Sequence, residues 1–376
     1  MSAVRRSNEV DIIRMAALIG ICVVNVPFMA LPVESVFIPP DSVYDKSAAF
    51  LVECFLQLKF FILFSFIFGW GMAIQSRSAE SKGLSFSKRY FRRMAGLAIL
   101  GVSHAILVFS GDILLLYALL GLFLWLIKNF SPRQLMKFAA WMLPLSMVFL
   151  TIIALLIDAV MTDEAISFAS IGGANLGGGF IEATKARFAD WPITLGFLVL
   201  LQGPLALGAF AAGLAAAKTD FFSENSAGFN LIQQRLPLLI IIALPLNILY
   251  AAVVGGIVPE AYEILSLLGF VLIAIGAPAL SLIYLYLFIR LSRMIKMPHL
   301  LVLAGQNSLS SYVAQGVLAG FVFGAYGLGL FHSLGHAALI PVSLTIALMA
   351  MVLVGVCAKI FGRGPLEPIL RKISGS

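Results

Sequence analysis

Leu100–Tyr117, LGVSHAILVFSGDILLLY, joins two apolar stretches through a break of only three residues, Ser110, Gly111 and Asp112. This break is too short for an ordinary loop, so the flanking stretches are predicted to be membrane-spanning helices that meet in a tight hairpin. Asp112 stands at the tip of the hairpin and His104 stands about two helical turns below it. Ionisable groups inside a bilayer are costly and usually functional, so both are candidate catalytic residues.

The composition of the whole chain supports a membrane protein. Hydrophobic residues make up 61% of the 376 residues, the mean hydropathy is +1.03, and apolar runs of bilayer length recur along the chain. These runs are continuous rather than alternating, which argues against a closed β-barrel. We therefore predict an all-α, polytopic transmembrane bundle. It forms a single integral membrane domain over 1–376, with N-terminal helices to about residue 217 and a C-terminal part over 218–376.

The number and direction of the helices follow from the apolar runs and the basic residues. About ten spans are predicted, over 12–32, 51–74, 93–110, 112–128, 137–157, 193–216, 236–256, 263–289, 300–325 and 338–360. With both termini in the cytoplasm, all Lys and Arg residues lie on the cytoplasmic side except Lys46, Lys59, Lys185 and Arg187. This asymmetry predicts an N-in, C-in topology. Because the positive charges sit at helix ends, the net charge of +7 does not indicate a nucleic-acid partner.

Three longer polar segments are predicted between the spans. Pro32–Phe50 and Asp158–Pro192 are expected as outer loops, and the glycine-rich run Gly172–Gly179 in the second is expected to form a lid or re-entrant turn. Within the same loop, Glu182–Arg187 is expected to begin an amphipathic helix. Gln75–Arg93 is expected as a basic cytoplasmic loop that faces lipid headgroups.

The first predicted span carries polar residues at both of its ends. Asp11 and Arg14 are three residues apart, so they share a helix face and can form an ion pair at the inner boundary. Alternatively, they form a cytoplasmic port for an anionic substrate, with Arg14 contacting its phosphate or carboxylate. Asn25, about three turns further along, either bonds to a neighbouring helix or lines a path through the bundle.

Lys59 lies inside the second predicted span, where a charge is costly unless it is paired. We expect its partner to be Glu53 or Asp112, which lie on the same side of the membrane in this topology. Lys59 is also a candidate substrate-binding residue.

A polar stripe enters the ninth predicted span from its cytoplasmic end. Its members recur at spacings of three and four residues, which places them on one helix face: Asn307, Ser308, Ser311, Tyr312 and Gln315. Such a stripe lines either a helix contact or a polar cavity. Because its depth matches that of Arg14, the two are expected to frame one inner vestibule.

No metal site is expected from the sequence. The three cysteines, Cys22, Cys54 and Cys357, are far apart and fall in or beside apolar runs, which is typical of buried small side chains. His332 and His336 have a spacing that metal ligands use, but no carboxylate accompanies them in a metal-binding motif.

Several blocks of the sequence resemble the YeiB-type family of uncharacterised bacterial ten-helix membrane proteins. These blocks are Val10–Arg14 with the run to Asn25, Lys59–Gly71, Tyr90–Tyr117 with its SGDIL segment, Leu205–Gly208, Gly305–Tyr312, Gly327–Leu330 and the RGPLE segment Arg363–Glu367. Met15 stands where the family commonly has glycine. The resemblance covers nearly the whole chain and implies an integral protein of the bacterial cytoplasmic (inner) membrane.

The first helix of this family is similar to that of the transmembrane acyltransferases, which include the heparan glucosaminide acetyltransferases. Those enzymes take an acyl group from cytoplasmic acyl-CoA and deliver it to an acceptor on the other face. Asn25 matches the asparagine at the end of their first helix. Their histidine, however, follows that helix, and Pro32–Phe50 contains none. His104 is therefore a candidate on chemical grounds alone.

Two functions are compatible with these features. In a transmembrane acyltransferase, Arg14 with the Arg89–Arg93 cluster, which includes Arg92 and Arg93, would hold the phosphates of acyl-CoA. His104 would be the general base and Asp112 would orient it, while Asn25 and the polar stripe would line the acyl path. We expect no permanently bound cofactor, a small-molecule or lipid-linked acceptor and the bilayer as partners, with homo-oligomerisation left open. The alternative is a transporter or flippase of a small amphipathic or lipid-linked solute, with Lys59, Asp112 and His104 as proton-coupling groups.

Overall fold

The computed structural model describes residues 8–162, 176–224, 226–259 and 262–375, and all regular structure in these ranges is helical. The helices are α1 (Asn8–Asn25), α2 (Pro27–Ala30), α3 (Val33–Phe37), α4 (Val43–Phe55), α5 (Lys59–Glu80), α6 (Phe86–Leu107), α7 (Leu114–Leu126), α8 (Pro132–Thr162), α9 (Phe180–Lys218), α10 (Ala227–Val254), α11 (Glu263–Met294), α12 (His299–Gln306), α13 (Ser308–Phe323), α14 (His336–Phe361) and α15 (Leu366–Ser374). The predicted all-α bundle is confirmed.

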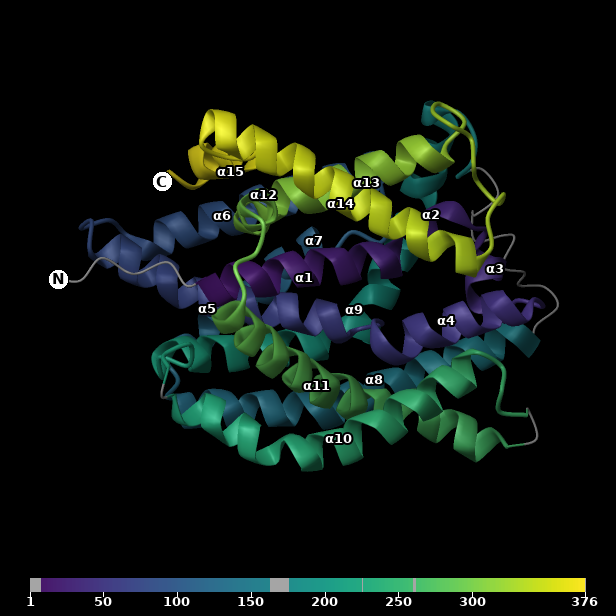
Figure 1. The fold of residues 1–376 in the computed structure, drawn as a ribbon, viewed down its shortest axis with the longest axis horizontal. Helices are drawn as coiled ribbons and strands as arrows, with labels where there is room; N and C mark the ends of the chain where they lie inside the picture. Colours follow the sequence, from purple (N-terminus) through teal and green to yellow (C-terminus); the bar gives the residue numbers. More distant parts are fainter. Residues whose placement is uncertain (1–7, 163–175, 225, 260–261, 376) are drawn as a thin grey trace.

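The long helices run along one common direction, with α1 in the middle of the bundle (Figure 1). α10 packs on α11, α9 packs on α5 and α8, and α14 packs on α12, while α6 and α7 form a hairpin. The beginning of α1 and the end of α15 lie at the same end of the bundle, which we call the terminal end (Figure 1). The other end, where α2, α3 and the beginning of α4 lie, is called the distal end.

Every predicted apolar stretch coincides with a helix or a helix pair, but these helices differ from one another in length. Seven segments of the described residues are long and apolar enough to cross a membrane: Asn8–Ala30, Val43–Glu80, Pro132–Ile157, Phe180–Lys218, Ala227–Val254, Glu263–Met294 and His336–Phe361. Leu114–Leu126 and Ser308–Phe323 are apolar but shorter. The number of ten spans and the N-in, C-in orientation therefore stay predictions.

Asp112, at the tip of the α6–α7 hairpin, lies inside the bundle and not at its surface. Asp112 is only 1% exposed. The 13 residues of α7 cover roughly 20 Å at 1.5 Å per residue, which is less than the roughly 30 Å of a bilayer core. The hairpin therefore turns inside the bundle, among side chains of other helices.

Two of the predicted continuous spans are interrupted. The stretch 51–74 is divided between α4 and α5, because Leu58 adopts a left-handed conformation with φ of 67°. The stretch 300–325 is divided between α12 and α13 at Asn307. Each interruption exposes helix-end peptide groups within the bundle, where side chains must satisfy them.

The predicted loops are shorter than the sequence suggested. Pro32–Phe50 contains α3 and the first half of α4, and α5 and α6 extend into Gln75–Arg93 and leave only 81–85 between them. The polar residues from Glu182 onward begin α9, which continues without interruption to Lys218. The first half of the glycine-rich run, residues 172–175, lies outside the described residues, as do Arg5 and Arg6 near the start of the chain.

Candidate functional site

His104 and Asp112 are in direct contact, which the sequence left open. The Nδ1 atom of His104 and the Oδ1 atom of Asp112 are 2.9 Å apart, and both side chains are buried. The other carboxylate oxygen, Oδ2, accepts hydrogen bonds from the main-chain nitrogens of Leu114 at 2.8 Å and Leu115 at 3.2 Å. Asp112 thus caps the first turn of α7 with one oxygen and holds the imidazole with the other.

The local sequence explains how the hairpin reaches this geometry. α6 ends at Leu107, where Arg187 from α9 donates hydrogen bonds to the carbonyl oxygens of Ile106 at 3.0 Å and Leu107 at 2.9 Å. These bonds satisfy carbonyls that the end of α6 leaves without helical partners. Gly101 permits the start of α7 to approach closely, because a Cβ atom there would collide with Leu115 and Asp112.

Tyr312 from α13 completes a cluster of three side chains around the hairpin. Its hydroxyl accepts a hydrogen bond from the main-chain nitrogen of Ile113 at 3.4 Å and lies beside the Asp112 carboxylate. Its ring centroid is 5.1 Å from that of His104. The cluster therefore connects the α6–α7 hairpin to the interrupted helix pair α12–α13.

The second ring nitrogen of His104, Nε2, is buried without a hydrogen-bond partner among the described residues. It faces Gly316 of α13, where an added Cβ atom would lie 2.7 Å from it. The glycine therefore leaves just enough space for the imidazole. His104 and Asp112 do not line the neighbouring cavity, whereas Tyr312 does.

A cavity of about 750 Å³ extends from the hairpin cluster toward the terminal end of the bundle. Its deep end is formed by Ile113, Leu114, Tyr117 and Tyr312, and its apolar wall by aromatic and aliphatic side chains such as Phe64, Phe68, Trp70 and Leu97. Its polar lining comes from Asp11, Arg14, Gln75, Ser78, Ser81, Arg93, Gln306, Asn307, Ser308, Arg363, Glu367 and Arg371. We call it the arginine cavity, because four arginines and only two acids line it.

Both acids of the arginine cavity are engaged by neighbouring groups. Asp11 lies 3.6 Å from the Nη1 atom of Arg14 and accepts a hydrogen bond from the side-chain amide of Gln306 at 2.8 Å. Glu367 accepts hydrogen bonds from the main-chain nitrogen and the hydroxyl of Ser310. The remaining positive charge makes the cavity suitable for an anionic ligand.

Two arginine nitrogens near this cavity are buried without hydrogen-bond partners among the described residues. They are Nε of Arg93, which lines the cavity, and Nη1 of Arg89, one turn earlier on α6. An unpaired buried guanidinium nitrogen is costly, so an anion that accepts its hydrogen bond would be stabilising. The N-terminus of α13, which begins at Ser308 in the cavity wall, adds the positive end of a helix dipole.

Five of the predicted substrate-binding residues lie together in this cavity: Asp11, Arg14, Arg93, Asn307 and Tyr312. Arg14 and the first part of the polar stripe therefore line one cavity, while its position on the inner side of a membrane stays a prediction. Asn307 also holds the α12–α13 interruption together. Its amide donates to the carbonyl of Leu303 and its Oδ1 atom accepts from the main-chain nitrogen of Gly364, both at 2.8 Å.

The other predicted substrate-binding residues lie away from the cavity. Ser311 donates to the carbonyl of Ala304 at 3.0 Å, and Gln315 donates to that of Leu18 at 3.3 Å, so both stabilise helix contacts. The stripe is therefore divided between two environments. Asn307, Ser308 and Tyr312 line the cavity, whereas Ser311 bonds to α12 and Gln315 bonds to α1. Asn25 ends α1 and does not line the arginine cavity. Arg92 is exposed on α6.

Lys59 is fully buried at the α4–α5 interruption and does not pair with Asp112. Its Nζ atom donates to the main-chain carbonyl of Glu53 at 2.8 Å. Of the two expected partners, Glu53 is therefore the one that the structure brings close, through its main chain.

Sequence reasoning missed the part of the cavity wall that the C-terminal segment supplies. Arg363, Glu367 and Arg371 line the cavity, and α15 packs against α6 and α13. In the sequence, the RGPLE segment Arg363–Glu367 stood out only because it resembles a block of the YeiB-type family, and that resemblance did not predict that it lines a cavity. Its partner in the fold, Ser310, is far away in sequence and could not be identified by spacing.

His332 and His336, which were not expected from the sequence to bind a metal, lie in different local environments. The Nε2 atom of His336 lies 3.2 Å from the main-chain oxygen of Ser35, and His332 adopts a positive φ of 57°. Within the described residues, no group of three or more His, Cys, Asp or Glu side chains could hold a metal ion.

Comparison with known proteins finds a family of unknown function and relatives that are uncharacterised. Residues 216–375 match the family described as "Protein of unknown function (DUF418)". The chain is 26% identical to the uncharacterised protein YxaH of Bacillus subtilis (strain 168), over 97% of this chain and 93% of that protein. It is 31% identical to the uncharacterised protein YeiB of Escherichia coli (strain K12), over 34% of this chain and 32% of that protein. No solved structure matches the chain. The resemblance to the YeiB-type family is confirmed.

Proposed function

Because the chain is a relative of the YeiB-type membrane proteins, whose family has no assigned activity, we propose its function from the arginine cavity. The cavity binds acyl-CoA from the cytoplasm, and the protein transfers the acyl group to a small-molecule or lipid-linked acceptor at the other face of the bacterial cytoplasmic membrane. One observation carries this proposal: a cavity lined by four arginines ends at Tyr312, which packs against the buried His104–Asp112 pair.

The lining of the cavity suits the two chemical parts of acyl-CoA. Guanidinium groups bind phosphates through charge-assisted hydrogen bonds, and Arg93 has a buried nitrogen with no partner among the described residues. The apolar wall of Phe64, Phe68 and Trp70 suits the pantetheine and acyl parts. A volume of about 750 Å³ falls in the range of roughly 300–1,000 Å³ that ligand pockets occupy.

The transfer proceeds at the deep end of the cavity in this proposal. The acceptor oxygen or nitrogen attacks the thioester carbonyl, the C–S bond breaks, and the acceptor proton passes to the CoA sulfur. Tyr312 is the member of the hairpin cluster that lines the cavity, so its hydroxyl is the group that meets the reacting atoms. His104 and Asp112 act through Tyr312 as positioning residues, because Asp112 lies beside its hydroxyl and His104 packs against its ring.

A binding experiment with neighbouring arginines tests the donor site. Purified full-length protein in detergent is titrated with CoA and acetyl-CoA by calorimetry. Arg93→Gln is expected to weaken binding about tenfold or more, because a charge-assisted hydrogen bond to phosphate is lost. Arg92→Gln, which removes an exposed arginine outside the cavity, is the matched control and leaves affinity within about twofold. A wild-type protein that binds neither ligand would refute the proposal.

A second candidate function, transport, is favoured by the two interrupted helices. Discontinuous spans are typical of transporters, where helix ends inside the membrane bind the solute, and α4–α5 and α12–α13 both have this form. In that case the arginine cavity is the inner vestibule through which the protein binds an anionic, amphipathic solute. Proton-dependent uptake into vesicles by protein that binds acetyl-CoA without transferring its acetyl group would favour the transporter over the enzyme.

A further inference from the structure

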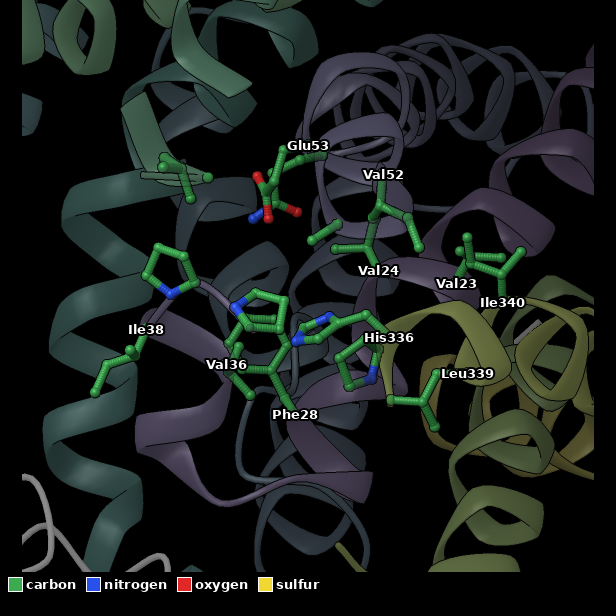
Figure 2. Close-up of a pocket in the computed structure, with 18 residues that line it drawn as sticks. Val23, Val24, Phe28, Val36, Ile38, Val52, Glu53, His336, Leu339 and Ile340 are labelled. Carbon is green, nitrogen blue, oxygen red and sulfur yellow. The ribbon is translucent and has the colours of Figure 1, made fainter. Parts of the chain in front are cut away.

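A second, smaller pocket of about 50 Å³ lies at the distal end of the bundle, away from the arginine cavity. It is lined by the end of α1, by α2, α3 and α4, by the end of α10, by the first turn of α14 and by the segment that joins α3 to α4. Figure 2 shows Glu53 at one margin of this pocket, with Val24 and Val52 beside it and Phe28 and His336 across from it. We call it the Glu53 pocket.

The carboxylate of Glu53 has an unused acceptor atom. Oε2 is buried and has no hydrogen-bond partner among the described residues. Lys59 donates to the main-chain carbonyl of Glu53 at 2.8 Å, so that bond does not satisfy the carboxylate. The hydroxyl of Tyr250 is the side-chain donor that meets the carboxylate. A buried acceptor without a donor is costly, so a bound O–H or N–H group would stabilise it.

The remaining walls of the pocket are almost entirely apolar. Val23, Val24, Phe28 and Leu339 supply aliphatic and aromatic surface, and Pro39 and Pro40 cover the pocket from the α3–α4 segment. His336 holds α3, the helix that precedes this cover, because its Nε2 atom lies 3.2 Å from the Ser35 carbonyl oxygen. The pocket is thus a small, mainly apolar slot with two polar side chains, Glu53 and Gln57, in its lining besides His336.

The charge already present beside Glu53 favours an uncharged hydrogen-bond donor as the ligand. The ammonium group of Lys59 lies close to Glu53 and already compensates the carboxylate charge. A second cation in the same apolar surroundings would add an unpaired buried charge, which is unfavourable. An uncharged hydroxyl satisfies Oε2 without this penalty, and a volume of about 50 Å³ exceeds the roughly 10–15 Å³ that one water molecule requires.

We propose that the Glu53 pocket binds a small uncharged molecule that carries a hydroxyl group on a short apolar stem. Glu53 Oε2 accepts the hydrogen bond of the hydroxyl, and Val24, Val52 and Phe28 contact the stem. This site is independent of the proposed acyl transfer, because none of its lining residues lines the arginine cavity.

Photolabelling tests this proposal on the full-length protein in detergent. The probe is a four-carbon primary alcohol that carries a diazirine, and the matched probe is its methyl ether, which has no donor. We expect the alcohol to label peptides containing Val23–Phe28 or Val52–Gln57 about fivefold more than the ether does, the discrimination that one net hydrogen bond provides. Equal labelling by the two probes overturns the proposal, and stronger labelling by the corresponding amine overturns its uncharged ligand.

Variants separate the role of the carboxylate from a general loss of folding. Glu53→Ala is expected to lower alcohol labelling to the level of the ether, and Val24→Phe, which fills the slot, is expected to abolish labelling by both probes. Glu80→Gln, which changes an exposed glutamate on α5, leaves labelling unchanged. Each variant must retain CoA affinity at the arginine cavity or, if no CoA binds, the elution profile and melting temperature of wild type. Undiminished alcohol labelling of a folded Glu53→Ala protein overturns the assignment of Oε2.

Discussion

Two pairs of ionisable residues lie inside the same bundle, and they are bonded in different ways. In the first, His104 and Asp112 bond directly at 2.9 Å, and Asp112 also accepts two main-chain hydrogen bonds. In the second, Lys59 bonds to the main chain of Glu53 at 2.8 Å, while Oε2 of Glu53 has no partner among the described residues.

This difference separates a carboxylate that organises the fold from one that can receive a ligand. Asp112 has little acceptor capacity left, because its two oxygens already hold α7 and the imidazole. Glu53 keeps one free acceptor atom beside a pocket. A buried carboxylate whose oxygens are both hydrogen-bonded adds rigidity, whereas a buried carboxylate oxygen without a donor is costly until something binds it.

The largest expected difference concerns stability on removal of each carboxylate. Asp112→Ala should lower the free energy of unfolding by about 3–5 kcal/mol, because three hydrogen bonds and the partner of buried His104 are lost. Glu53→Ala should cost less, since fewer bonds depend on that carboxylate. Thermal unfolding in detergent measures both. A loss for Glu53→Ala that equals the loss for Asp112→Ala would contradict the comparison.

Double-mutant cycles measure the coupling within each pair directly. His104→Ala with Asp112→Ala should give a coupling energy of about 1–3 kcal/mol, as expected for side chains in direct contact. Lys59→Met with Glu53→Gln should give a smaller value, because their hydrogen bond uses the Glu53 main chain, which the substitution keeps, and only the charge compensation between the side chains is lost. A larger coupling in the lysine–glutamate pair would show that this charge compensation is stronger than the direct His104–Asp112 bond.

The fold itself followed largely from the sequence, whereas the site followed only in part. Continuous apolar runs fix where helices lie, since a bilayer core requires long apolar helices. They do not reveal an interruption such as the one at Leu58, whose backbone is left-handed although leucine has no preference for that conformation. The stretch 51–74 therefore looked continuous and is not.

The candidate site shows the same limit more sharply. The ionisable residues of the hairpin were identified because charge inside an apolar run is conspicuous, and spacing placed Asp11 and Arg14 on one face. Their companions Glu367 and Arg371 come from the C-terminal segment, which reaches the cavity by packing against α6. Tertiary contacts between distant segments leave no local pattern, so this part of the cavity wall could not be predicted.

The close fit around His104 predicts a further effect on stability. Gly316→Ala would place a Cβ atom 2.7 Å from His104 Nε2 and 2.9 Å from a methyl group of Val108, which overpacks the cluster by about 1–3 kcal/mol. Gly196→Ala is the matched control within α9, because nothing lies within 4 Å of a Cβ atom there. This control should be neutral or slightly stabilising. A Gly316→Ala protein as stable as wild type would show that the imidazole moves freely.

The smallest expected effect on stability comes from Tyr312→Phe, and it separates the structural role of this hydroxyl from its proposed chemical role. The variant loses a bond of 3.4 Å to Ile113, so its unfolding free energy should fall by only about 0.5–1.5 kcal/mol. CoA affinity should stay near that of wild type, since the arginines are intact. Acyl transfer, in contrast, should fall about 100-fold if Tyr312 meets the reacting atoms. Unchanged transfer by this variant would return the catalytic role to His104, which would then need an opening past Gly316 to reach the substrate.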